Sequence, residues 1–64
     1  MTFAPSHFDY RGFRLYHCQP DKWVAVNISN DGWPVGEVVM TWHGYYDHDE
    51  LKRDLDELIE EGCL

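Results

Sequence analysis

The fold is decided by the C-terminal stretch DHDELKRDLDELIEEG, which spans residues 47–62 of the 64-residue chain. Its branched apolar residues recur at i, i+4, i+7 and i+8, the spacing of an apolar stripe along one side of a helix: Leu51, Leu55, Leu58 and Ile59. Asp47 and Glu50 stand three residues apart, as in a capping box, and Gly62 supplies the usual C-terminal stop. The pattern predicts a helix over residues 48–61.

Three segments before this helix alternate between apolar and polar residues, which is typical of strands. They cover residues 13–18, 23–29 and 36–42. The stretches between them, Gln19-Pro20-Asp21-Lys22 and Asn30-Asp31-Gly32, carry residues that favour turns. Because both connections are short, we expect an α+β fold in which a three-stranded antiparallel meander packs against the C-terminal helix.

The apolar stripe of the helix requires an apolar face on the sheet. The strand side chains that we expect on this face are Phe13, Leu15, Val24, Val26, Ile28, Val38 and Met40. Residues 1–9 show no clear alternation, and we expect them to be loosely ordered. A chain of 64 residues has room for one domain, so residues 1–64 are expected to fold as a unit.

The negative charge of the chain is concentrated in the predicted helix. The whole chain carries −7, and segment 47–61 alone carries −6, because it holds eight acidic residues against two basic ones. Acids in the first turn are favoured by the helix dipole, but Glu60 and Glu61 lie at its negative end. Asp56–Glu60 and Glu57–Glu61 are also like-charge pairs at i,i+4. The stability of the helix therefore does not explain these C-terminal acids.

Two interpretations of the acidic helix remain open. It is either a solvated face that keeps a small protein soluble, or a binding surface for a basic partner. Closely spaced carboxylates resemble the phosphates of nucleic acid, which carries about one charge per 1.7 Å of duplex axis. Such a surface would block a nucleic-acid-binding groove without itself binding nucleic acid. The candidate partner-binding residues are Asp49, Asp54, Asp56, Glu57, Glu60 and Glu61. Two opposite-charge pairs at i,i+4, Asp49–Arg53 and Lys52–Asp56, are expected to support the helix.

Aromatic residues provide a second candidate contact surface. Its members are Arg14, Tyr16, Trp23, Trp33, Tyr45 and Tyr46. The first three are expected on the sheet face away from the helix, and the last three in loops near strand ends. Aromatic side chains on an open sheet can stack bases, but the negative charge of the chain favours contact with a protein, for which Trp and Tyr are common anchors.

The sequence contains no recognisable catalytic or metal-binding motif. His17 and Cys18 are neighbours on a predicted strand and point to opposite faces, so they cannot act as a base and a nucleophile together. The histidines and cysteines do not have the spacing of zinc ligands. We therefore expect no enzymatic activity, no cofactor and no metal. Cys18 and Cys63 are expected to be free thiols in a reducing compartment, and a disulfide between them is the alternative.

Hydropathy bears on where the protein acts. No apolar run approaches the roughly 20 residues that a membrane span requires. Residues 1–6 have neither the basic region nor the apolar run of a signal peptide. We expect a cytoplasmic protein with no membrane contact, and we favour a monomer.

The layout of the whole chain resembles that of small phage and mobile-element proteins. The opening Tyr10-Arg11-Gly12-Phe13-Arg14-Leu15, the two hairpins and the closing Asp47-His48-Asp49-Glu50-Leu51 carry this resemblance. These proteins include anti-CRISPR inhibitors, which are short and acidic, and several of which mimic DNA. The resemblance implies a phage-type inhibitor that acts in a host bacterial cell on a CRISPR effector complex of the Cascade type. A second resemblance, to the RNase-H-like domain of HicB-type antitoxins, implies a protein that covers the active surface of a toxin. A non-catalytic accessory interaction domain is the remaining alternative.

Overall fold

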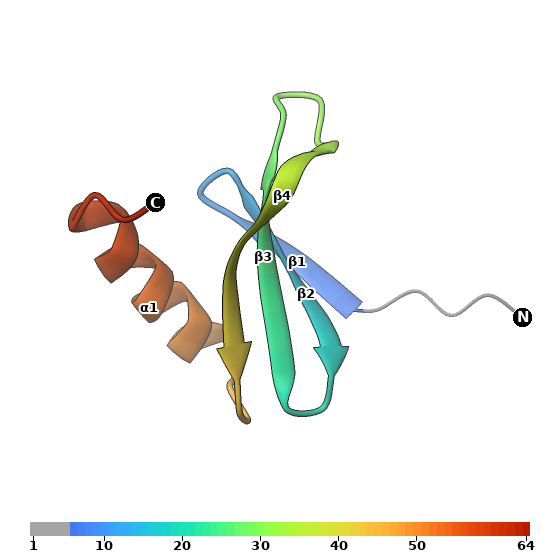
Figure 1. The fold of residues 1–64 in the computed structure, drawn as a ribbon, viewed down its shortest axis with the longest axis vertical. Coiled ribbons are helices and arrows are strands. Elements are labelled where there is room, and N and C mark those ends of the chain that lie inside the picture. Colours follow the sequence, from blue (N-terminus) through green and yellow to red (C-terminus); the bar gives the residue numbers. More distant parts are fainter. Residues whose placement is uncertain (1–5) are drawn as a thin grey trace, which may run out of the picture.

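The computed structural model describes residues 6–64. Four strands and one helix follow one another along this part of the chain (Figure 1). They are β1 (Ser6–Tyr10), β2 (Phe13–Gln19), β3 (Lys22–Ile28), β4 (Pro34–His43) and α1 (His48–Glu60). The strands form one antiparallel sheet in the order β1-β2-β3-β4. The α+β class, the antiparallel sheet and the C-terminal helix are confirmed, but the sheet has four strands and not three.

The additional strand is β1, in the region that we expected to be loosely ordered. It pairs with β2 along its whole length, after a tight turn in which Arg11 and Gly12 both have positive φ. Phe8 and Tyr10 alternate with polar residues and pack against the core, and this alternation was the signal of a strand. The rest of the region, residues 1–5, lies outside the described residues.

The two faces of β3 are the reverse of those predicted. Trp23 and Ala25 are buried in the core beneath the helix. Three side chains that were predicted to face the helix are therefore on the opposite face: Val24, Val26 and Ile28. Trp23 stands directly opposite Trp42 of β4. Burial of this large aromatic pair removes more apolar surface from water than burial of the valines would, and it sets the face of the strand.

A β-bulge in β4 changes which of its residues face the helix. Ala25 is paired with Met40, but the next residue, Val26, is paired with Val38, so Val39 is an extra residue in β4. Met40 remains on the helix side, as predicted, and packs against the core. Val38 was predicted on the same side but is 51% exposed, because the bulge shifts the alternation by one position.

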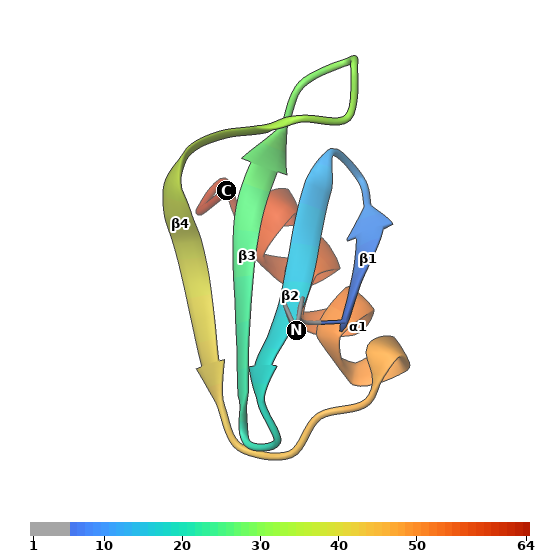
Figure 2. The same ribbon diagram turned by 90° about the vertical axis from the view of Figure 1, so that its right-hand side faces the viewer.

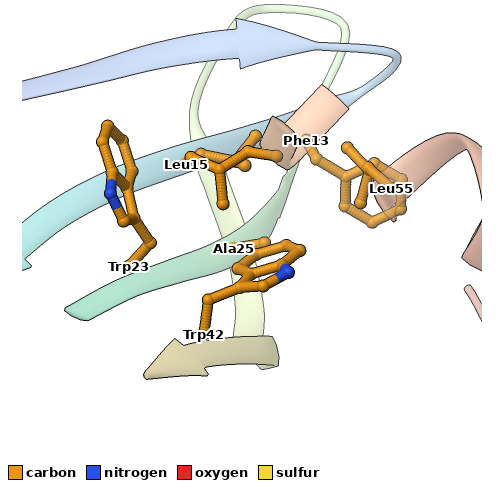
Figure 3. Packing of buried hydrophobic residues seen from close by; sticks show 7 residues of the cluster. Phe13, Leu15, Trp23, Ala25, Trp42 and Leu55 are labelled. Atoms are coloured by element: carbon orange, nitrogen blue, oxygen red, sulfur yellow. The ribbon is translucent and has the colours of Figure 1, made fainter. Parts of the chain in front are cut away.

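The core lies between α1 and one face of the sheet (Figure 2). Leu51 and Leu55 have no exposed surface, and Figure 3 shows Leu55 beside Phe13. Leu58 and Ile59, the remaining residues of the helical stripe, are only partly buried. The buried residues are Phe13, Leu15, Trp23, Ala25, Trp42, Leu51 and Leu55.

The ends of α1 match the sequence prediction closely. The backbone N–H of Glu50 donates to the carboxylate of Asp47 at 2.8 Å, and the backbone N–H of Asp47 donates to the carboxylate of Glu50 at 3.3 Å. This reciprocal pair is the predicted capping box. At the other end the chain leaves the helix at Gly62, whose φ of 79° suits a glycine.

Strand β4 is longer than predicted. It begins at Pro34, opposite Ile28, rather than at residue 36, and it continues to His43. Proline has no backbone N–H to donate to the ladder, so it is tolerated as the first residue of an edge strand. The loop before it is closed by the backbone N–H of Ser29, which donates to the carbonyl of Trp33 at 2.8 Å.

Candidate partner-binding surface

The buried stripe of α1 divides the candidate acids into two groups. At about 100° per residue, three of them lie on the side of the stripe where Asp56 meets the β1–β2 turn, and we call this group the β1 flank: Asp49, Asp56 and Glu60. The other three project toward β4 and form the β4 flank: Asp54, Glu57 and Glu61. The two groups meet on the solvent side of the helix, where Glu57 and Glu60 are neighbours at i,i+3, but they have different surroundings.

On the β1 flank, Asp56 is bound to the turn between β1 and β2. Its carboxylate accepts hydrogen bonds from the Tyr10 hydroxyl at 2.9 and 3.0 Å and from the Arg11 guanidinium at 2.7 Å. The bond from Arg11, followed by the bond from Tyr10, holds the pKa of Asp56 below its usual range. The same carboxylate raises the pKa of Tyr10. Asp56 is thus neutralised within the chain and offers little charge to a partner.

Lys52, the predicted partner of Asp56, instead lies over aromatic rings. Its Nζ is 5.8 Å from the centroid of the Phe8 ring and 5.6 Å from that of Tyr10, within the range of cation–π contacts. No ion pair between Asp49 and Arg53 occurs within residues 6–64. The surroundings of Asp56 on the β1 flank are therefore filled by cations and aromatic rings of the same chain.

The β4 flank borders a groove between α1 and β4. The groove has a volume of about 360 Å³, and its apolar wall includes Met40, Trp42 and Leu58. Within the described part of the chain, Asp54, Glu57 and Glu61 form no ion pair. Helix α1 has no basic residue in its last turn that could offset these charges. The three acids of the β4 flank therefore keep their negative charge uncompensated within the described residues.

The three aromatic-surface candidates expected on the open sheet face are not together. Trp23 is only 3% exposed and lies on the helix side, where its ring stacks on His17 with centroids 4.3 Å apart. Arg14 and Tyr16 pair with outward-facing residues of β3, as predicted. The Arg14 guanidinium donates to both oxygens of Asp9, at 2.7 and 3.1 Å, and this bond lowers the pKa of Asp9. Trp23 is therefore a core residue and is removed from the candidate surface.

The three loop candidates differ in exposure. Tyr45 is 82% exposed and Trp33 is 70% exposed, whereas Tyr46 packs against the core and borders the groove beside β4. Trp33 stands at the end of the β3–β4 hairpin, and Tyr45 stands between β4 and α1. These two side chains lie in separate loops, so Tyr46 is the aromatic loop candidate that adjoins the acids of the β4 flank.

Sequence reasoning missed two features of this surface. One is the contact of β1 with the start of the helix, where the Phe8 ring stacks on His48 with centroids 4.2 Å apart. The other is the groove beside β4. Its signal was present in the sequence, because residues at i, i+3 and i+7 share one side of a helix, and this is the spacing of Asp54, Glu57 and Glu61.

Three further observations concern the cysteines, the potential metal ligands and the helix of the described region. Cys18 and Cys63 are exposed free thiols. Within residues 6–64, no three His, Cys, Asp or Glu side chains lie together in an arrangement that could hold a metal ion. No helix in this region is both long and apolar enough to cross a membrane.

The chain was compared with models of protein families, with curated proteins and with solved structures, and none of the three comparisons found a match. The fold and the surface define the class of protein: a small α+β domain whose single helix presents an acidic groove beside the edge of an antiparallel sheet.

Proposed function

We propose that this domain is a non-catalytic inhibitor whose acidic helix binds the nucleic-acid-binding groove of a basic protein. The observation that carries the proposal is a group of carboxylates toward the C-terminal end of α1 that have no ion-pair partner within residues 6–64. It consists of the β4 flank, Asp54, Glu57 and Glu61, and the neighbouring Glu60.

Local stability gives no reason for these carboxylates. Acids near a helix C-terminus face the negative end of the helix dipole, and Glu57–Glu61 is a like-charge pair at i,i+4. Each effect costs only tenths of a kcal/mol, but both have the same sign. By contrast, the N-cap Asp47 and the first-turn Glu50 form the capping box. A basic partner surface would turn the unfavourable acids into favourable contacts and would speed association through long-range attraction.

The partner that the family resemblance implies is a CRISPR effector complex of the Cascade type, whose DNA-binding groove must be basic to hold phosphates. An acidic helix in that groove competes with DNA directly. The inhibitor is proposed to act in the cytoplasm of the bacterial host, without contacting nucleic acid itself.

Charge reversal tests the proposal. The variant Glu57→Lys, Glu60→Lys, Glu61→Lys changes exposed side chains away from the buried stripe, and it leaves Asp56 in its bonds to the β1–β2 turn. We expect it to fold, as judged by far-UV circular dichroism, and to lose inhibition of DNA binding by a purified Cascade-type complex. Pull-down from a CRISPR-bearing lysate, followed by mass spectrometry, identifies other basic partners if this complex is not bound.

The matched control changes the opposite sheet face, with Arg14→Ala and Tyr16→Ala. If this control loses partner binding while the charge-reversed helix retains it, the helix is not the binding surface. That result would favour the alternative of an antitoxin-like cover. The alternative has its own support in three exposed apolar side chains of the β3–β4 hairpin, Trp33, Val35 and Val38, which such a cover would bury.

A further inference from the structure

The groove between α1 and β4 combines an apolar wall with an acidic rim. Met40, Trp42 and Leu58 supply apolar surface, and Tyr46 adds an aromatic ring with a hydroxyl group. The rim is formed by the β4 flank, Asp54, Glu57 and Glu61. A ligand that suits both parts carries positive charge at one end of a flat or apolar group.

The opposite side of the same helix shows how this chain accommodates such a group. There the guanidinium of Arg11 binds the carboxylate of Asp56 at 2.7 Å, and Lys52 lies over the rings of Phe8 and Tyr10. Carboxylate, aromatic ring and cation are all supplied by the chain. On the β4 flank the carboxylates and the rings are present, but no lysine or arginine lines the groove.

The side chain of Trp42 provides an independent indication of a ligand. Trp42 is only 4% exposed, yet its indole N–H makes no hydrogen bond within residues 6–64. Within the described residues, the fully buried side-chain nitrogen without a hydrogen bond is that of Trp23. The indole nitrogen of Trp42 also lacks a hydrogen bond but is not fully buried, so it keeps some contact with solvent. Figure 3 shows the Trp42 ring extending from β4 over the core, and Trp42 is one of the residues that line the groove. A donor without a partner on a residue that lines the groove is available to an acceptor from outside, such as a peptide carbonyl.

From these observations we propose that the groove binds an arginine side chain presented on an extended segment of a protein partner. The guanidinium would form charge-assisted hydrogen bonds with the carboxylates of the β4 flank and stack against Tyr46, while a backbone carbonyl of the segment accepts the Trp42 N–H. The inference rests on the proposed function, since it names the group on the basic partner that the helix recognises. Arginine suits the site better than lysine because its planar guanidinium can form two parallel hydrogen bonds with one carboxylate and can stack on an aromatic ring.

The test uses the full chain, labelled with ¹⁵N, and three synthetic eight-residue peptides. They contain three arginines, three lysines or three glutamines at the same positions among glycines. Binding is followed by the NMR signal of the Trp42 indole N–H and by the backbone amides of α1. We expect the arginine peptide to shift the Trp42 indole signal and to bind more tightly than the lysine peptide, with no binding of the glutamine peptide.

Two variants with the same net charge distinguish binding at the groove from attraction by the overall negative charge of the chain. Asp54→Asn, Glu57→Gln, Glu61→Gln removes the rim, and Asp21→Asn, Asp31→Asn, Glu37→Gln removes the same charge from exposed positions outside the groove. The rim variant should weaken binding of the arginine peptide by about tenfold or more, and the control by less than about threefold. Trp42→Phe, which keeps a ring but removes the N–H, should also weaken binding.

Several outcomes would overturn the inference. Equal losses of peptide affinity in the two triple variants would show that net charge alone attracts the peptide. Equal affinity for the arginine and lysine peptides would show that the groove does not select arginine. Identical NMR shifts on addition of Mg²⁺ alone would show that the groove binds a metal ion rather than an arginine side chain. The two proposals also fail separately. If the groove does not bind the arginine peptide but charge reversal of the helix still abolishes inhibition, the proposed function stands without this site.

Discussion

Replacement of Leu55 by alanine tests the packing of the helix on the sheet most directly. Leu55 is 0% exposed and lies in the middle of α1, against Phe13 of β2 (Figure 3). Leucine-to-alanine changes at fully buried positions cost about 2–5 kcal/mol, because apolar contacts are lost and a cavity remains. At roughly 0.05–0.15 kcal/mol per residue, a chain of 64 residues has about 3–10 kcal/mol of total stability. The substitution should remove a large part of it.

Urea denaturation followed by tryptophan fluorescence measures this loss. Trp23 and Trp42 are buried and should report unfolding, whereas Trp33 is already 70% exposed. With a urea dependence of about 1 kcal/mol per molar for so small a domain, the unfolding midpoint of Leu55→Ala should fall by about 2 M or more. If that variant is already unfolded in water, Leu55→Val should still fold, with a loss of about 1 kcal/mol.

Leu58→Ala is the matched control on the same helix. Leu58 is only partly buried, so its truncation should cost less than that of Leu55. If Leu58→Ala proved as costly as Leu55→Ala, or if Leu55→Ala left the midpoint unchanged, the helix would not pack on the sheet in the way described.

Four further predictions concern β1, the helix cap, acid stability and nucleic acid. Phe8→Ala should lower the free energy of unfolding by about 1–3 kcal/mol, because Phe8 is partly buried beneath the helix, and an unchanged thermal midpoint would argue against β1 as part of the fold. Asp47→Ala removes the capping box and should cost about 0.5–2 kcal/mol in the same measurement, with reduced helical circular dichroism. The pKa of Asp56 is lowered in the folded state, so its contribution to stability is present above the ordinary value of 3.8 and is lost as the pH falls below it. Thermal midpoints measured from pH 6 to pH 2.5 should therefore decline less steeply for Asp56→Asn than for the parent, and parallel curves would contradict this. The protein should not retard duplex DNA in a gel-shift assay at physiological salt, and tight, salt-sensitive retardation would count against an acidic mimic.

The helix could be predicted almost completely from sequence because its signals are local. The stripe of Leu51 and Leu55, the capping box and Gly62 all lie within the same 16 residues. Each can therefore be recognised from spacing within one segment. The structure confirms the start of the helix, the cap and the two buried leucines.

The sheet was harder to predict because its faces depend on contacts between distant residues. Residues 23–26 of β3 are all apolar, so alternation there does not say whether Trp23 or Val24 faces the helix. The pairing of Trp23 with Trp42 decides it, and this pairing is a property of two strands together. The bulge at Val39 has no local signal either, since it arises from the register between β3 and β4.

The candidate site was predictable in composition but not in arrangement. The sequence identified the acids of α1, but it could not show that Asp56 is neutralised by Arg11, which is 45 residues away. It also could not place Trp42 and Tyr46 beside the β4 flank, because the groove exists only when the helix lies along the sheet.

The order of the strands has a consequence for how the chain folds. Every strand pairs with its neighbour in the sequence, so the whole hydrogen-bonded ladder is assembled by closing short loops, each at small entropic cost. Only the docking of α1 brings remote segments together, as in the bond between Tyr10 and Asp56, which are 46 residues apart. Local pairings of this kind favour rapid folding, and we expect the docking of the helix, which joins remote segments, to follow the pairing of the strands. The surface proposed to meet the partner would then be the last part of the molecule to form, and the groove beside β4 would be completed in the same step that buries Leu55.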